Sequence, residues 1–354
     1  MSTLTKFAVE KAIASRLSQV NFDAIVFGGI PSDHMLKAVW RDGKWGEARI
    51  MPFADLRMSP FTVALHYGQT IFEGMKAFRR TDGDISVFRP HKHLARFNRS
   101  AVRMAMPEVP EAYFVEGLRQ LVELDKKWVA DQAGFSLYLR PMMFASEARI
   151  GLRIPNEFTF LILASPAPPY YTKALRMKVE TEYVRAAKGG AGFAKCGGNY
   201  GAACFPTQLA IQQGFDQLLW TDARDHQFFE EAGNMNVFFV VENQLITPPQ
   251  SDSILDGVTR DSLLALGRDM GMEVVEKAFG IDDLVAEKAR GRLKEVFGAG
   301  TAAVVAPIQS IQIGAHLLEL DADYPVALEL KRRLEAIRSG QSADTRNWNL
   351  IVAG

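Results

Sequence analysis

The chain has 354 residues, which is long enough for two domains with a sizeable core. Its 41 basic and 41 acidic side chains cancel, so it has no bulk electrostatic reason to bind nucleic acid or an anionic membrane. The two cysteines, Cys196 and Cys204, form neither a CxxC nor a Cys/His cluster. This usage argues against a disulfide scaffold and against a zinc site, so no bound metal is expected, and it favours a reducing compartment.

The N-terminal residues 1–17 contain no apolar stretch of the kind found in secretory signals, and no run in the chain is long and apolar enough to span a bilayer. The segment is weakly amphipathic, with three basic residues and the single acid Glu10. A mitochondrial presequence is compatible with this pattern, but a solvated first helix is favoured. We therefore expect a cytoplasmic protein.

The first half of the chain contains strands and helices without a regular βαβ alternation. Apolar patterning predicts strands at 35–40, 85–88, 135–144 and 157–164, and helices at 91–106 and 111–131. The strand at 157–164 is nearly all apolar, which is typical of a buried strand.

The segment ASPAPPYYTK at 164–173 places three prolines directly after this strand. Proline removes a backbone donor and fixes φ, so the segment is typical of a connection that leaves a strand. We predict a smaller domain at 1–165, a linker at 166–175 and a larger second domain at 176–354.

In the second half, strands are predicted at 176–185, 215–221 and 237–241, and helices at 200–214, 258–270 and 326–339. The last helix begins just after Pro325 and ends before Gly340, as helices often do. The mixture predicts an α+β (mixed α/β) architecture.

The stretch AKCGGNYGAAC at 194–204 places the single lysine Lys195 just before paired glycines. Such glycines permit a tight turn or a close backbone approach. A lysine whose amine is partly neutral can form a Schiff base. From these residues alone, a surface-loop lysine is the favoured alternative.

In FEEAGNMNVFFV at 229–240, the acids Glu230 and Glu231 precede a turn of small residues and an apolar strand. One inward carboxylate could hold a cationic heterocycle nitrogen. The alternative is a solvated loop acid, and we expect at least one of the two glutamates to be solvated.

In SILDGVTRDSLLALG at 253–267, Gly257 precedes Val258 and Thr259 at the start of a predicted helix. The free N–H groups and the dipole of a helix start can bind a phosphate, although most helix starts bind nothing. In FGAGTAA at 297–303, the Thr301 hydroxyl could contact the same anion. Neither loop is a Walker or GxGxxG motif.

In FRPHKHLARFNRSAVR at 88–103, the arginines Arg96, Arg99 and Arg103 share one helical face. Periodicity predicts a solvated basic face, and phosphate binding would need one of them turned into a cleft. His91 and His93 are two residues apart, so they do not form a metal pair on one helical face. No GxSxG of a serine hydrolase occurs.

Taken together, these stretches resemble the branched-chain aminotransferases of the fold-type IV family of pyridoxal-phosphate enzymes, in particular the longer subgroup with the animal enzymes. The matching segments, in the family's order, are HYGQTIFEGMKAF (66–78), FRPHKHLARFNRSAVRM (88–104), LYLRP (137–141), KCGGNYG (195–201), EEAGNMNVF (230–238), LDGVTR (255–260) and FGAGTAA (297–303). The resemblance implies a two-domain homodimer that reversibly transfers the amino group of L-leucine, L-isoleucine or L-valine to 2-oxoglutarate.

The resemblance also implies residue roles toward pyridoxal 5'-phosphate. Lys195, on the second domain, would hold the cofactor and shuttle a proton at the substrate α-carbon, and Glu231 would pair with the pyridine nitrogen, which keeps the ring an electron sink. Tyr200 would hydrogen-bond the phenolic oxygen. The remaining cofactor contacts would come from Arg96, Val258, Thr259 and Thr301 at the phosphate, and from Asn234, Leu255 and Gly257.

For the substrate, the resemblance implies an apolar and aromatic wall, which suits branched aliphatic side chains because they need no polar partner. Its residues would be Phe27, Tyr67, Phe72 and Tyr138. Arg140 or a tyrosine hydroxyl would meet the side-chain carboxylate of glutamate. The amides of Thr301 and Ala302 would hold the α-carboxylate.

The sequence departs from the subgroup at two points. Residues 303–306 are AVVA where the animal-type enzymes carry a CxxC, so that thiol switch is absent. Asn234 stands where threonine is frequent, which leaves the hydrogen bonding there open.

Other functions share parts of this pattern. D-amino-acid aminotransferases, R-selective amine transaminases and aminodeoxychorismate lyases have the same lysine and acid, but their chains are usually shorter. A homologue that binds the cofactor without catalysis is disfavoured by the intact Lys195, Glu231 and Arg96. A protein without any ligand would require the whole motif series to be coincidental.

Overall fold

The computed structural model describes residues 6–132 and 134–353. These form two compact units. Unit 1 contains the described residues up to Tyr170, together with Ala194–Gly198 and the residues from Ala336 onward, and unit 2 contains Tyr171–Phe193 and Asn199–Glu335. The first boundary between the two units thus falls after Tyr170, inside the predicted linker. Lys195, however, belongs to unit 1 and not to the unit that contains most of the second half of the chain.

Unit 1 is built on a ten-stranded sheet in the order β1-β4-β2-β9-β8-β6-β7-β19, with β3 paired to β2 and β5 paired to β8. The strands are β1 (Ala8–Val9), β2 (His34–Arg41), β3 (Lys44–Trp45), β4 (Arg49–Pro52), β5 (Thr70–Phe72), β6 (Met75–Arg79), β7 (Ile85–Phe88), β8 (Ser136–Ala145), β9 (Glu157–Ala167) and β19 (Asn349–Val352). The four strands predicted in this half are confirmed, and β9 is almost entirely buried, as its apolar sequence indicates.

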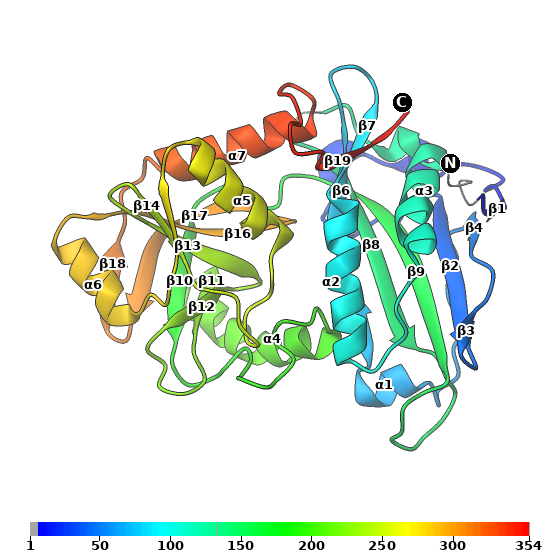
Figure 1. Ribbon diagram of the computed structural model, residues 1–354, viewed down its shortest axis with the longest axis horizontal. Coiled ribbons are helices and arrows are strands. Elements are labelled where there is room, and N and C mark those ends of the chain that lie inside the picture. Colours follow the sequence, from blue (N-terminus) through cyan, green and yellow to red (C-terminus); the bar gives the residue numbers. More distant parts are fainter. Residues whose placement is uncertain (1–5, 133, 354) are drawn as a thin grey trace. The chain divides into compact units, whose positions relative to one another are not determined.

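The helical segments of unit 1 are η1 (Leu17–Gln19), η2 (Phe22–Ala24), α1 (Val63–Tyr67), α2 (Pro90–Arg103), η3 (Ala112–Glu116), α3 (Gly117–Leu124) and η4 (Lys126–Trp128). Helices α2 and α3 lie side by side along the sheet (Figure 1). Gly117 permits α3 to pack closely on β2, since a Cβ there would lie 2.6 Å from Leu36 of β2.

One helix prediction in unit 1 is confirmed in part, and another is wrong. The chain expected to be helical at 111–131 is helical through η3 and α3 to Leu124 and again in η4. It is interrupted at Asp125, whose carboxylate accepts the backbone N–H of His34 (3.0 Å). The expected first helix is absent from residues 6–16, where β1 pairs with β4 and the Ala12 N–H donates to His34 Nε2 (2.9 Å). Residues 1–5 of that prediction lie outside the described residues.

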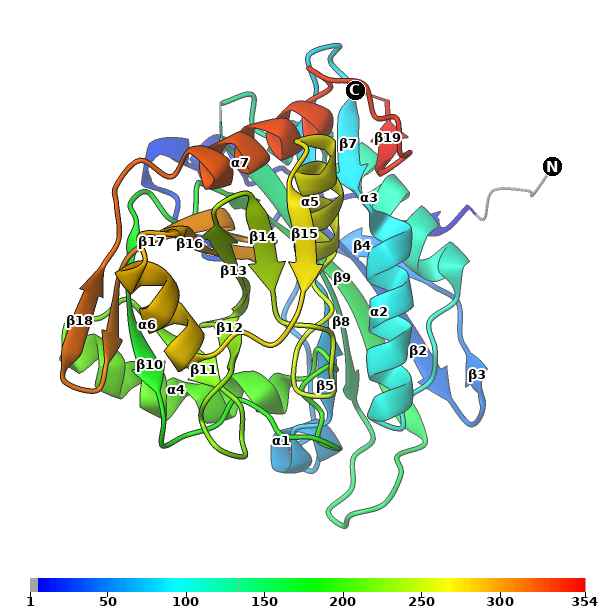
Figure 2. The same cartoon turned by 60° about the vertical axis from the view of Figure 1, so that its left-hand side comes forward.

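Unit 2 contains a nine-stranded sheet in the order β12-β11-β10-β17-β16-β13-β14-β15. An additional β12–β13 pairing closes the strands from β12 to β13 into a ring, and β18 pairs with β17. Figure 2 shows β13, β14 and β15 side by side. The strands are β10 (Leu175–Glu180), β11 (Gln217–Thr221), β12 (Phe229–Ala232), β13 (Met235–Val241), β14 (Gln244–Thr247), β15 (Glu273–Glu276), β16 (Leu293–Gly300), β17 (Val304–Ile313) and β18 (His316–Glu319).

The longer helices of the second half are α4 (Gly197–Gln212), α5 (Val258–Asp269), α6 (Ile281–Ala289) and α7 (Pro325–Arg338). The three helices predicted here are confirmed, although α4 begins three residues earlier than predicted, at Gly197. The strand predicted at 176–185 ends at Glu180, because the Glu180 carboxylate accepts the N–H groups of Glu182 and Tyr183 and forms a turn. The combination of helices and strands is the predicted α+β architecture.

In the part of the chain that the structure describes, no helix has both the length and the apolar character needed to cross a membrane.

Candidate functional site

The backbone of Lys195 is fixed by two elements of unit 1. The Lys195 N–H donates to Ser100 Oγ on α2 (3.0 Å), and its carbonyl accepts the N–H of Phe72 on β5 (3.0 Å). A Cβ at Gly197 would lie 2.4 Å from Thr70 Oγ1, so the first glycine after the lysine serves a close backbone approach. The interpretation of Lys195 as a surface-loop residue is therefore wrong.

The amine of Lys195 lies in a partly buried environment over the Phe72 ring, with Nζ 4.7 Å from the ring centroid. Burial and the positive charge of Arg96 lower the pKa of Lys195 to about 8, against the opposing effects of Glu73 and Tyr138. At pH 7 about a tenth of the amine is consequently uncharged, far more than for an ordinary lysine, and a nucleophile and proton carrier requires this neutral form.

Arg96 lies beside Lys195 and is 3% exposed, whereas Arg99 and Arg103 of the same helix are exposed. The predicted solvated basic face is thus wrong for Arg96. Its Nε and Nη2 donate to the two carboxylate oxygens of Glu73 at 2.7 and 2.8 Å. Burial alone would raise the pKa of Glu73, but Arg96 and His93 hold it well below its usual range.

Three of the predicted substrate-wall residues lie together with Arg140 in unit 1. The Arg140 guanidinium lies over the rings of Phe72 (4.7 Å) and Tyr138 (5.2 Å), and its Nη2 donates to Tyr138 Oη (3.1 Å). Phe27 meets the edge of Tyr138 at 4.8 Å between ring centroids. Tyr67 stands apart at the end of α1, where its ring is 42% exposed and neighbours His66.

In unit 2, Glu231 is 2% exposed on β12, opposite Asn236 of β13. Its Oε1 accepts the N–H of Leu255 (2.7 Å), and Asn236 Nδ2 donates to the carbonyl of the same residue (2.9 Å). Arg185 Nη2 lies 3.1 Å from Glu231 Oε1. A guanidinium and a backbone N–H therefore both contact this buried carboxylate.

Glu230, the other acid of the pair, is 8% exposed and accepts a hydrogen bond from Ser253 Oγ. Burial raises the pKa of Glu230. Both acids are thus buried, and the expectation that one of them is a solvated loop acid is wrong.

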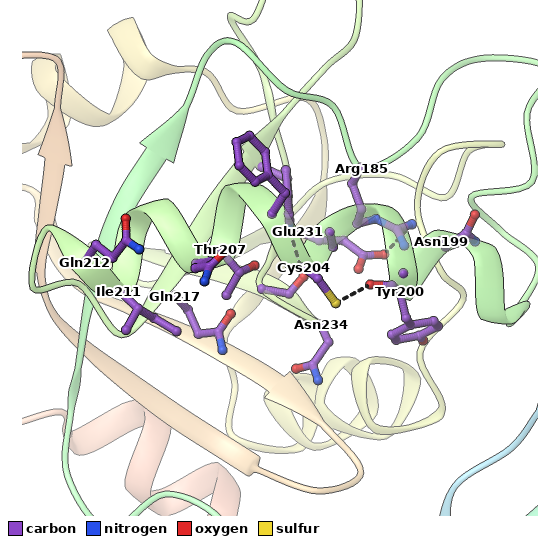
Figure 3. A pocket seen from close by; sticks show the side chains of 16 residues that line it. Arg185, Asn199, Tyr200, Cys204, Thr207, Ile211, Gln212, Gln217, Glu231 and Asn234 are labelled. Atoms are coloured by element: carbon purple, nitrogen blue, oxygen red, sulfur yellow. Dashed lines mark hydrogen bonds and ion pairs between the residues drawn. The ribbon is translucent and has the colours of Figure 1, made fainter.

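A cavity of about 920 Å³ in unit 2 is lined by Glu231, Arg185, Tyr200 and Asn234, together with further residues of α4. Figure 3 shows the Glu231 carboxylate and the Arg185 guanidinium together at one end of this cavity, near Tyr200. Three of the predicted cofactor contacts therefore line one hollow, whose charged end is the Glu231–Arg185 pair.

The predicted phosphate-binding segments of unit 2 are a helix start and a turn. Gly257 is the extended N-cap of α5, followed by the buried Val258 and Thr259, and no side chain of the described residues caps this end of the helix. The N–H groups of a first helical turn have no intrahelical partner, so they can bind an anion. Thr301 and Ala302 form the turn between β16 and β17.

Several residues of these surroundings had no role in the sequence analysis, namely Glu73, His93, Ser100, Arg185 and Asn236. Glu73 and His93 lie within the motifs that carried the resemblance, but motif matching assigns no contacts. Arg185 precedes Lys195 by ten residues without a spacing signal, so only the folded chain reveals that it reaches Glu231.

Residues 70–311 match the amino-transferase class IV family, and the chain belongs to this family. Among its relatives, the branched-chain-amino-acid transaminase 1 of Bacillus subtilis (strain 168) is 42% identical over 333 residues, which cover 92% of this chain and 94% of that protein.

The fold is similar to solved structures of the same group. For the branched-chain aminotransferase of the archaeon Thermoproteus uzoniensis with norvaline, the TM-score is 0.73 at 26% identity, covering 89% of this chain and 99% of that one. For the T.th. branched-chain amino acid aminotransferase complexed with N-(5'-phosphopyridoxyl)-L-glutamate, it is 0.70 at 26% identity, with coverage of 88% and 97%.

Proposed function

We propose that the protein is a pyridoxal-phosphate-dependent branched-chain-amino-acid aminotransferase. It exchanges the amino group of L-leucine, L-isoleucine or L-valine with 2-oxoglutarate, giving branched 2-oxo acids and L-glutamate. The 42% identity to the Bacillus subtilis transaminase over nearly the whole of both chains supports this substrate class. The phosphopyridoxyl-glutamate complex of the T.th. enzyme supports the cofactor and glutamate as a partner substrate.

The residues present fit this cofactor. The observation that carries the proposal is the partly buried Lys195 with its pKa lowered to about 8, because an aldehyde needs an uncharged amine. The buried carboxylate of Glu231 suits a protonated ring nitrogen. The α5 start, with Val258 and Thr259, and the Thr301 hydroxyl suit a phosphate, for which Arg96 supplies positive charge.

When bound, the cofactor supplies an electron sink for the charge that develops at the substrate α-carbon. The amine of Lys195 would carry the proton between the substrate α-carbon and the cofactor, and back in the reverse half-reaction. Glu231, which contacts Arg185 and the Leu255 N–H, would pair with the ring nitrogen. Tyr200 would donate to the phenolic oxygen.

The substrate side chain packs on Phe27, Phe72 and Tyr138, whose apolar surface suits branched aliphatic groups. Arg140, held by Tyr138 Oη, pairs with the side-chain carboxylate when glutamate or 2-oxoglutarate is bound. The amides of Thr301 and Ala302 bind the α-carboxylate of either substrate.

The protein is also proposed to be a cytoplasmic homodimer. The free cysteines Cys196 and Cys204 are consistent with a reducing compartment. Unit 1 exposes the apolar Phe61 (53%), Ile150 (57%) and Leu152 (81%), and the Arg149 N–H donates to the Phe61 carbonyl (2.7 Å), which brings the two loops together. Such a patch is typical of a subunit interface. Light scattering that gives a monomer at micromolar concentration would contradict this state.

The deciding experiment is the visible absorbance of the purified protein with pyridoxal phosphate. We expect a yellow band that bleaches with L-leucine and returns with 2-oxoglutarate. A band that responds only to D-alanine or a simple amine would move the protein to another member of the fold family. A cofactor band that no amino donor bleaches indicates a non-catalytic binding protein, and absence of any band overturns the proposal.

A further inference from the structure

Glu73 is a fully buried carboxylate for which the proposed chemistry has no direct use. It is 0% exposed and lies between β5 and β6, where its N–H donates to the Pro141 carbonyl (2.7 Å). Its side chain faces two basic residues of α2: Arg96, bound through Nε and Nη2, and His93, whose Nδ1 lies 2.6 Å from Oε2. A buried charge of this kind is costly unless it is fully paired.

The geometry of the cluster fixes the guanidinium of Arg96. His93 and Arg96 are three residues apart on α2, so they share one helical face. The two parallel N–H···O bonds from Arg96 to Glu73 define both the position and the plane of the guanidinium, as a bidentate pair does. His93 holds the carboxylate in turn, and burial lowers the pKa of His93, which favours its neutral form.

An arginine held in this way is prepared to bind an anion. Its long side chain is already ordered, so less conformational entropy is lost when a ligand arrives. The same carboxylate also neutralises the buried guanidinium before any anion is bound.

We propose that Glu73 is a positioning residue that orients Arg96 for the phosphate of the cofactor, with His93 holding Glu73 in place. This inference rests on the proposed function. A purely structural ion pair would stabilise the fold without favouring a phosphorylated ligand over a dephosphorylated one. The proposed role therefore predicts a specific loss of phosphate discrimination when Glu73 is altered.

The test compares two probes, pyridoxal phosphate and pyridoxal, by equilibrium titration of the full-length apoprotein and its variants. In Glu73→Gln the carboxylate charge is lost while the size is kept. Residues that orient a binding side chain typically contribute about 10–100-fold to affinity at metal sites, and we expect a loss of this order for pyridoxal phosphate. The affinity for pyridoxal should change by less than about threefold, so the ratio of the two affinities collapses.

Glu116→Gln is the matched control. Glu116 also pairs with an arginine in unit 1, since Arg119 Nε lies 3.0 and 2.9 Å from its two oxygens, but it has no place in the proposed site. We expect this variant to keep the wild-type ratio of affinities. The thermal midpoint of each apoprotein reports the structural part of each substitution separately.

A double-mutant cycle with Arg96→Ala separates positioning from a general effect. In the Arg96→Ala background, Glu73→Gln should change the pyridoxal phosphate affinity by less than about threefold. If Glu73→Gln does not fold, Glu73→Asp, which keeps the charge but withdraws it by one methylene, should show an intermediate loss of the ratio. If Glu73→Gln, or the folded Glu73→Asp variant, keeps the wild-type ratio of the affinities for pyridoxal phosphate and pyridoxal, the role of Glu73 is overturned while the proposed function stands. Wild-type protein that binds neither probe overturns the proposed function as well.

Discussion

Glu73 in unit 1 and Glu231 in unit 2 are both buried carboxylates paired with an arginine, yet their surroundings differ. Glu73 is 0% exposed, and Arg96 and His93 enclose both of its oxygens. Glu231 is 2% exposed, meets Arg185 at 3.1 Å and a backbone N–H, and lines a cavity. Burial and ion pairing alone therefore do not distinguish a residue that meets a ligand from one that holds a neighbour.

The difference lies in what each carboxylate can still reach. A carboxylate enclosed by side chains acts on its neighbours through charge and hydrogen bonds. A carboxylate that lines a cavity can also pair with a cation that enters it. We expect substitutions around Lys195 and Glu231 to affect chemistry, and those around enclosed pairs to affect binding or stability.

The largest effect is expected at Lys195. Lys195→Ala should lower the turnover of L-leucine with 2-oxoglutarate by about four orders of magnitude or more, because both the cofactor link and the proton carrier are lost. The thermal midpoint of the apoprotein should be retained, since the substitution removes a partly buried charge. Lys188→Ala, at an exposed lysine, is the control. Retention of full activity in Lys195→Ala would overturn the assignment of the lysine.

The next largest effect is expected on kcat when the neighbouring acids Glu231 and Glu230 are substituted in turn. Glu231→Ala should reduce kcat by about 10²–10³-fold, the range found when one preorganised electrostatic group is removed from an active site. Glu230→Ala should reduce it by less than about tenfold, with its main effect on the thermal midpoint, because Glu230 binds Ser253 and not the cavity. Steady-state kinetics of both variants decide the ranking, and the reverse order would show that the wrong acid is assigned.

Arg140 separates the two substrates. Arg140→Ala should raise KM for 2-oxoglutarate by about 10–100-fold, since a charged hydrogen bond contributes about 1.5–3 kcal/mol. The half-reaction with L-leucine should change by less than about threefold, as its side chain carries no carboxylate. Stopped-flow measurement of the two half-reactions tests this, with Arg99→Ala on the exposed face of α2 as control. Equal losses for both substrates would exclude the selective role.

The smallest expected effect is a shift in pH dependence. The rate at which apoprotein combines with pyridoxal phosphate should rise about tenfold per pH unit and level off above about pH 8, because only the neutral Lys195 amine reacts and its pKa is lowered to about 8. An ordinary lysine would level off near pH 10.4. Since Arg96 lowers the pKa of Lys195, Arg96→Ala should move the midpoint upward. A wild-type rate still rising tenfold between pH 9 and 10 would contradict the lowered pKa.

The sequence predicted the fold best where local chemistry decides the structure. The helix from Pro325 to Arg338 was found from the proline before it and the glycine after it, and β9 from its continuous apolar run. The helix expected at 111–131 is interrupted after Leu124, where Asp125 and Trp128 bind His34 and Asp33, which are more than ninety residues away. Local periodicity contains no information on such partners.

The sequence by itself determined the order of the motifs and with it the family, and it predicts the roles of the lysine and the acid. Only the tertiary structure decided that Arg96 is buried while Arg99 and Arg103 of the same helix face are exposed. The physical reason is that the burial of a charge depends on a partner, and Glu73 reaches Arg96 across 23 residues of sequence. The lowered pKa of Lys195 arises in the same way, from neighbours that the folded chain brings together.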